Sequence, residues 1–133
     1  MAEKKYTMSV TSTGGGREGH VAGDGNIDMD LSARGTNPEA LLAAAWAGCF
    51  NGALQLKMKE RGIDVEAQKP EVTANVSFYT EDGGFKIGAE VVVTFADKDA
   101  IDDVDALIAD THAFCPVSKV FRGETVELVA RAA

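Results

Sequence analysis

The sequence predicts a single α+β domain that covers residues 1–133. Three observations support this prediction: a glycine-punctuated first third rich in β-prone residues, one long run of helix-forming residues, and two β-prone segments joined by a turn. Because helices and strands do not alternate regularly, the order argues against a parallel doubly wound sheet. A chain of 133 residues can bury roughly two thirds of its unfolded surface, so it needs no disulfide to fold.

Short strands are expected in the N-terminal third. Residues 5–13 are β-prone, the glycines at 14–16 interrupt that pattern, and the Gly-Asp-Gly-Asn sequence at 23–26 marks a turn. Residues 27–31 then alternate apolar and polar side chains with a period of two, which is typical of a half-buried strand.

A long helix is predicted from Pro38 to about Arg61. Asn37 can cap it, Pro38 suits the first helical position, and Glu39 is favoured at the positive end of the helix dipole. Gly62 is expected to end it. The helix is apolar all round in its first half, so we expect a second copy of the chain to cover part of it in a homodimer. The predicted buried face contains Leu41, Leu42, Ala45, Cys49, Gly52, Ala53 and Leu56.

The second half is predicted to hold a hairpin, two helices and a closing strand. Residues 71–80 and 85–95 are β-prone and are joined by a Glu-Asp-Gly-Gly turn sequence. Residues 99–113 carry apolar side chains at helical spacing, and a short helix is expected to restart at Pro116. Residues 124–131 alternate as a last strand.

Charge and hydropathy exclude several classes of partner. The net charge of −8, without a cluster of Lys or Arg, argues against binding to nucleic acid or to an anionic membrane. No stretch reaches the roughly 18 apolar residues of a membrane span, and the first residues lack the apolar run of a signal peptide. We therefore expect a cytoplasmic protein whose thiols are kept reduced.

The two cysteines, Cys49 and Cys115, are the candidate reactive groups. Taken alone, Cys49 is most simply a small core residue, whereas Cys115 precedes Pro116 at a junction where its side chain can reach across. A reactive thiol needs a nearby cation or a helix N-terminus, and the glycine-flanked Arg17 is the candidate cation. Glu39 is the carboxylate that could hold its guanidinium. Taken alone, Arg17 is a solvated loop charge.

A metal site is the alternative interpretation of the same cysteines. His112 and Cys115 have a ligand-like spacing, and Cys49 and His20 could complete a set of two cysteines and two histidines. These are scattered pairs, whereas structural zinc sites usually show two closely spaced pairs. In that case the chain would be a non-enzymatic dimeric protein that binds zinc or another ligand.

Three segments together resemble the organic hydroperoxide resistance (Ohr) branch of the OsmC/Ohr family. They are GGREG at residues 15–19, TNPEAL running to GCF at 36–50, and CPVSK with RG at 115–123. The resemblance covers nearly the whole chain in the right order. It implies an OsmC-like fold, with antiparallel sheets around a long central helix in an intertwined homodimer.

The resemblance also implies a thiol peroxidase of the antioxidant stress response. Cys49 would attack an organic hydroperoxide and become a sulfenic acid, and Cys115 would resolve it as a disulfide. Arg17 would activate Cys49, and Glu39 would hold Arg17. The implied reductant is a dithiol, a lipoyl protein or dihydrolipoamide, and no cofactor or metal is required. Val117 is more typical of the OsmC branch, which leaves an OsmC-type peroxidase of broader substrate range as an alternative.

Overall fold

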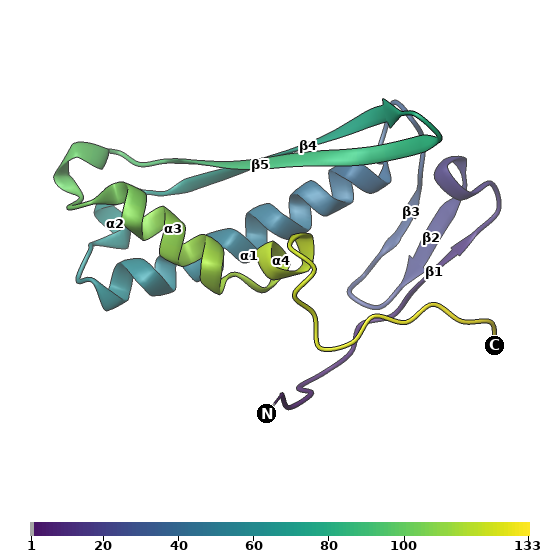
Figure 1. Ribbon diagram of the computed structural model, residues 1–133, viewed down its shortest axis with the longest axis horizontal. Helices are drawn as coiled ribbons and strands as arrows, with labels where there is room; N and C mark the ends of the chain where they lie inside the picture. Colours follow the sequence, from purple (N-terminus) through teal and green to yellow (C-terminus); the bar gives the residue numbers. More distant parts are fainter. Residues whose placement is uncertain (1) are drawn as a thin grey trace. The chain divides into compact units, whose positions relative to one another are not determined.

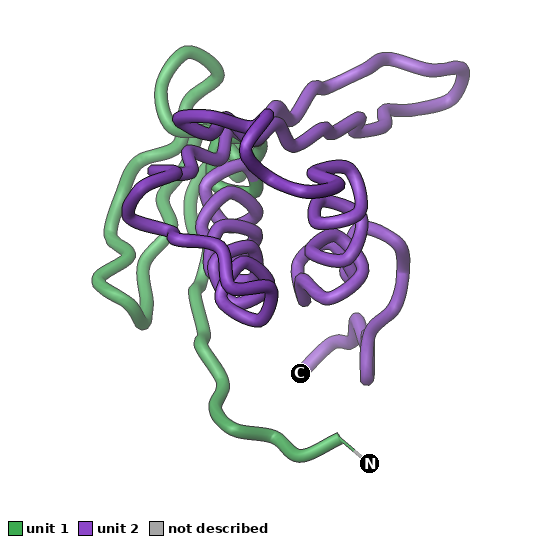
Figure 2. Tube along the Cα trace, turned by 90° about the vertical axis from the view of Figure 1, so that its left-hand side faces the viewer, with its two compact units in different colours: residues 1–42 green, residues 43–133 purple. Residues whose placement is uncertain are grey.

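The computed structural model describes residues 2–133, which form two compact units that divide between Leu42 and Ala43 (Figures 1 and 2). Helix α1 (Pro38–Glu60) begins in the first unit and continues into the second. Among residues 2–133, no helix is long and apolar enough to cross a membrane.

The first unit contains an antiparallel three-stranded sheet. Its strands β1 (Val10–Thr13), β2 (His20–Gly23) and β3 (Asp28–Asp30) pair in the order β1-β2-β3. The turn predicted between β2 and β3 is confirmed, with Gly25 and Asn26 both at positive φ. A positive φ is accessible to glycine and tolerated by asparagine, which is why this sequence turns here.

The strands of this sheet are shorter than the sequence predicts. The strand expected over 5–13 begins only at Val10, and the one expected over 27–31 keeps its three central residues. Strand β2 was not predicted, because three residues between two glycines give too short a pattern to recognise. Gly23 is required where it stands, since a Cβ there would clash with the backbone carbonyl of Ser9.

Helix α1 begins and ends as predicted. The Asn37 side-chain oxygen accepts a hydrogen bond from the backbone N–H of Ala40 at 2.9 Å, which caps the first turn. The helix ends at Glu60, and Gly62 follows in the left-handed conformation at φ +72°.

The buried face of α1 differs from the predicted one. Gly52 and Leu56 are exposed, Cys49 is half-buried, and of the predicted face only Ala53 belongs to the core. Alanines occur on all sides of the first half of the helix, so the spacing of hydrophobic residues alone does not determine which face is buried. The large apolar side chains determine it, because they bury the most apolar surface. The buried residues of α1 in the second unit are Trp46, Phe50, Ala53, Leu54 and Met58.

The predicted hairpin is confirmed to within one residue at each end. Strands β4 (Glu71–Glu81) and β5 (Gly84–Thr94) pair antiparallel along their whole length, and Gly83 turns between them at φ +83°. The hairpin lies along α1 in Figure 1, and its Val72 and Val91 pack against the core. A short helix that the sequence analysis did not predict, α2 (Val65–Gln68), precedes it.

Two further helices complete the second unit. The helix expected over 99–113 is divided into a 3-10 turn, η2 (Lys98–Ala100), and helix α3 (Val104–Phe114). The division occurs because the Asp103 side chain caps the backbone N–H of Ala106. Helix α4 (Pro116–Phe121) starts at Pro116 as predicted.

The predicted closing strand is wrong. Residues 124–133 belong to no helix or strand, and the apolar side chains that suggested a strand are exposed: Val126 by 84%, Leu128 by 89% and Val129 by 72%. A segment with alternating apolar residues forms a strand only where its backbone pairs with the edge of a sheet. In the single described chain, residues 124–133 pair with no strand.

Candidate active site

Arg17 lies in the 3-10 helix η1 (Gly16–Glu18) and contacts Glu39 at the start of α1, both within the first unit. One terminal nitrogen, Nη2, donates to both carboxylate oxygens of Glu39, at 2.8 and 3.0 Å. The predicted ion pair therefore forms. Glu39 is buried, with 7% of its surface exposed, so the ion pair is only partly screened by solvent.

Glycines allow the chain to bring Arg17 to this position. Gly14 and Gly16 both adopt positive φ, which other residues rarely do. A side chain at Gly19 would clash with the carbonyl oxygen of Thr13. The GGREG segment is thus a tight loop built around one arginine.

The two cysteines meet in the second unit. Cys49 is half-buried on α1, Cys115 is fully buried at the N-cap of α4, and both are free thiols. Cys49 packs against the core cluster to which Cys115 belongs, and the Cys115 thiol is close enough to raise the pKa of Cys49. Two cysteines 66 positions apart are therefore adjacent in the fold, as a working thiol pair requires.

The surroundings of Cys49 hold it largely in the thiol form. Burial raises the pKa of the Cys49 thiol above its ordinary value. The backbone N–H of Val117 lowers it, because this hydrogen bond favours the thiolate, and Cys115 raises it through hydrogen bonding and charge. Among residues 2–133, the groups that shift the pKa of Cys49 include no positively charged side chain.

His20 does not join the cysteines. It belongs to the first unit, where its Nδ1 contacts Asp30 at 2.8 Å and its Nε2 contacts Asp28 at 2.6 Å. These hydrogen bonds, that to Asp30 first, raise the pKa of His20 above its ordinary value. Among residues 2–133, no group of three or more His, Cys, Asp or Glu side chains is arranged to hold a metal ion.

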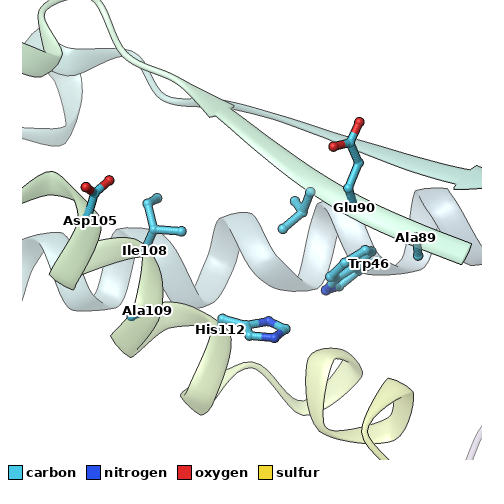
Figure 3. A pocket seen from close by; sticks show the side chains of 8 residues that line it. Trp46, Ala89, Glu90, Asp105, Ile108, Ala109 and His112 are labelled. Atoms are coloured by element: carbon cyan, nitrogen blue, oxygen red, sulfur yellow. The ribbon is translucent and has the colours of Figure 1, made fainter.

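An open cavity of about 430 Å³ lies beside the thiol pair's helices (Figure 3). Trp46 enters it from α1 and His112 from α3, and β5 closes it from the other side. Its volume lies within the usual range for small-molecule sites, although neither cysteine is part of its lining. The lining residues are Trp46, Ala89, Glu90, Val91, Asp105, Ile108, Ala109 and His112.

Comparisons with known proteins identify the family of this chain. The model of the OsmC-like protein family matches residues 30–129, most of the chain. The chain belongs to the OsmC-like family. Its similarity to individual relatives is also high: it is 40% identical to the organic hydroperoxide resistance protein OhrB of Bacillus subtilis, over 89% of this chain and 91% of that protein.

Further relatives place this OsmC-like chain in the Ohr branch. It is 36% identical to OhrA of Bacillus subtilis, over 92% of this chain and 93% of the relative. The crystal structure of OhrB matches with a TM-score of 0.75, covering 89% of this chain and 92% of that one. The organic hydroperoxide resistance protein OsmC from Legionella pneumophila, 30% identical, matches with a TM-score of 0.76 over 92% and 93% of the two chains. The predicted α+β, OsmC-like fold is confirmed.

The OsmC-like chain also holds a polar contact that the sequence analysis missed. The hydroxyl of Ser118 on α4 lies 2.8 Å from Trp46 Nε1 and 3.0 Å from His112 Nδ1. A signal was available in the spacing: Trp46 precedes Cys49 by three residues, and His112 and Ser118 flank Cys115 by three. Residues three apart on a helix share a face, so each cysteine has a polar neighbour one turn away.

Proposed function

We propose that this chain is a thiol peroxidase that reduces organic hydroperoxides to alcohols. The observation that carries the proposal is the proximity of Cys49 and Cys115, both free thiols, in one core cluster. The names of its relatives, organic hydroperoxide resistance proteins, support the same substrate class.

The proposed reaction begins at Cys49, because its sulfur is the one that is partly exposed. Its thiolate attacks the terminal oxygen of the hydroperoxide, and the O–O bond breaks. The leaving alkoxide takes a proton and departs as an alcohol, while Cys49 becomes a sulfenic acid. Cys115 then displaces the sulfenic hydroxyl as water, and the resulting disulfide is reduced by exchange with an external dithiol. The proposed reductant is a lipoyl protein or dihydrolipoamide.

Arg17 is proposed to supply the charge that activates Cys49. Burial and Cys115 both raise the pKa of the Cys49 thiol, so the thiolate needs a cation to be populated at neutral pH. Arg17 stays charged at every relevant pH, and its contacts with Glu39 fix its orientation. Glu39 is accordingly proposed to be a positioning residue for Arg17.

A thiol count tests the proposal directly. The reduced protein should lose two free thiols per chain after one equivalent of cumene hydroperoxide, and its mass should show one intrachain disulfide. Hydrogen peroxide at the same concentration should react more slowly, because the surroundings of Cys49 are largely apolar. A protein that keeps both thiols under these conditions would not be a peroxidase of this kind. Equal rates with both oxidants would favour the broader OsmC-type substrate range.

We also propose that the protein works as a homodimer. Apolar side chains are exposed along residues 124–133 and on the β4–β5 hairpin, among them Leu128, Tyr79, Phe85 and Ile87. Exposed apolar surface of this extent marks an interface. Segment 124–133 has strand-like alternation without a strand partner, and a sheet edge of a second copy offers one.

Sedimentation equilibrium should give twice the 14.0 kDa mass of one chain. Leu128→Lys should weaken the dimer on the order of tenfold, because it places a charge at a site that the dimer buries. Thr125→Lys is the matched control, since it adds the same charge to a polar, exposed position of the same segment. A monomer at micromolar concentration, or equal dimer stability in both variants, would contradict this proposal.

A further inference from the structure

The buried hydroxyl of Ser118 joins three helices of the second unit. It lies between Trp46 Nε1 of α1, at 2.8 Å, and His112 Nδ1 of α3, at 3.0 Å, while Ser118 itself belongs to α4. An indole N–H can only donate, so the serine oxygen accepts from Trp46. The direction of the Ser118–His112 contact depends on the His112 tautomer: the hydroxyl donates to Nδ1 when the ring proton is on Nε2. Among residues 2–133, no buried side-chain nitrogen or oxygen lacks a hydrogen-bond partner, and this contact is no exception.

This contact is one helical turn from each sulfur. Trp46 precedes Cys49 by three residues on α1, and Ser118 follows Cys115, the N-cap of α4, by three. Cys49 receives two groups from the start of α4, the Cys115 side chain and the backbone N–H of Val117. The hydrogen bond from Trp46 to Ser118 therefore links the turn of α1 that carries Cys49 to the first turn of α4. That first turn presents the Cys115 side chain and the Val117 N–H to Cys49.

Apolar packing alone would hold α4 in place without this bond. The Trp46 ring packs against Phe121 with centroids 4.9 Å apart, and Val117 packs against the core. Such contacts tolerate sliding, because dispersion and burial depend weakly on direction. A hydrogen bond depends on both distance and angle, so the Ser118 contact adds the precision that a sulfur-to-sulfur reaction needs.

We propose that Ser118 is a positioning residue for disulfide formation, holding Cys115 in line with Cys49 through its bonds to Trp46 and His112. This inference rests on the proposed peroxidase chemistry. In the step concerned, Cys115 gives up its proton and its sulfur attacks the sulfur of the Cys49 sulfenic acid. The S–S bond forms as the S–O bond breaks, and the hydroxide leaves with that proton as water.

Ser118→Ala tests the inference, with Trp46→Phe as a second variant that removes the donor and keeps an aromatic ring. Each reduced protein is mixed with one equivalent of cumene hydroperoxide, and the reaction is quenched at intervals with a sulfenic acid-trapping dione. Mass spectrometry then gives the sulfenic acid and disulfide fractions. In both variants disulfide formation should slow about tenfold, while sulfenic acid formation should stay within about twofold of the wild-type rate.

Two further comparisons separate positioning from stability. Ser77→Ala makes the same chemical change at an exposed serine of β4 and should leave both steps unchanged. The double variant Trp46→Phe, Ser118→Ala should resolve no more slowly than Ser118→Ala alone, because Ser118→Ala already lacks both bonds of the hydroxyl. If Ser118→Ala lowers the melting temperature but keeps the wild-type ratio of disulfide to trapped sulfenic acid, Ser118 contributes to stability only and does not position Cys115.

The outcomes also separate this inference from the proposed function. If the wild-type protein forms no disulfide with cumene hydroperoxide, the peroxidase proposal itself fails. If the wild type forms it and both variants form it at the same rate, only the role of Ser118 is overturned. Should Ser118→Ala not fold, the Trp46→Phe measurement decides, because the serine and histidine are intact in that variant.

Discussion

Cys49→Ser should lower the rate of cumene hydroperoxide reduction by about 10⁴-fold or more, the scale seen when a covalent nucleophile is removed. A serine hydroxyl cannot be oxidised to a sulfenic acid, so the first step is lost. The remaining thiol, Cys115, is fully buried and gives peroxide no access. Steady-state assays with dihydrolipoamide as the reductant measure the loss.

Cys115→Ser is the matched control, because it removes the other sulfur of the same pair. It should keep the first turnover and then accumulate the Cys49 sulfenic acid, which dione trapping and mass spectrometry detect. With dihydrolipoamide in excess, turnover should continue only as fast as the external thiol reaches Cys49. The reverse pattern, a first turnover that survives Cys49→Ser and is lost in Cys115→Ser, would exchange the roles of the two cysteines.

Local signals in the sequence predicted the elements that carry this site. Asn37, Pro38 and Gly62 bound helix α1 because capping and left-handed conformations are properties of single residues. The β4–β5 hairpin followed in the same way from its Asp-Gly turn. The ion pair of Arg17 with Glu39 came from chemical complementarity and from the family resemblance together.

Features that depend on distant packing could not be predicted. Segment 124–131 has the alternation of a strand, but a strand exists only where another edge pairs with it. The buried face of α1 was misjudged because alanines give no preference, and Trp46, Phe50 and Met58 settle it through partners elsewhere in the unit. The hydrogen bonds of the Ser118 hydroxyl also depend on packing between helices, because its two partners lie 72 and 6 residues away in the sequence.

The strongest constraint on the mechanism comes from the surroundings of Cys49. Its own unit supplies one group that favours the thiolate, the N–H of Val117, against burial and Cys115, which favour the thiol. A nucleophilic thiolate at neutral pH therefore needs a further positive contribution. Among the charged groups of the chain, Arg17 combines a permanent charge with an orientation fixed by a buried carboxylate.

Arg17→Ala should lower the rate of hydroperoxide reduction at neutral pH by about a hundredfold. In the proposed site the Arg17 guanidinium stabilises the Cys49 thiolate. An opposite charge close to a group favours its ionised form by roughly ten- to a thousandfold in the ionisation constant, and under this proposal the variant loses that factor. The sign follows directly: without the cation, the pKa of the Cys49 thiol rises, and the thiolate fraction at neutral pH falls. The pH dependence of iodoacetamide alkylation at Cys49 should shift to higher pH accordingly.

Three comparisons make this result specific. Arg34→Ala removes the same charge from an exposed position of the same unit and should change neither the rate nor the alkylation profile. Glu39→Gln should give a smaller loss than Arg17→Ala, because the cation remains and only its orientation relaxes. Raising the pH should reduce the difference in hydroperoxide reduction rate between Arg17→Ala and the wild type, because at alkaline pH the Cys49 thiol ionises even in the absence of the cation. A gap that stays constant with pH, together with an unshifted alkylation profile, would show that Arg17 acts on something other than the ionisation of Cys49.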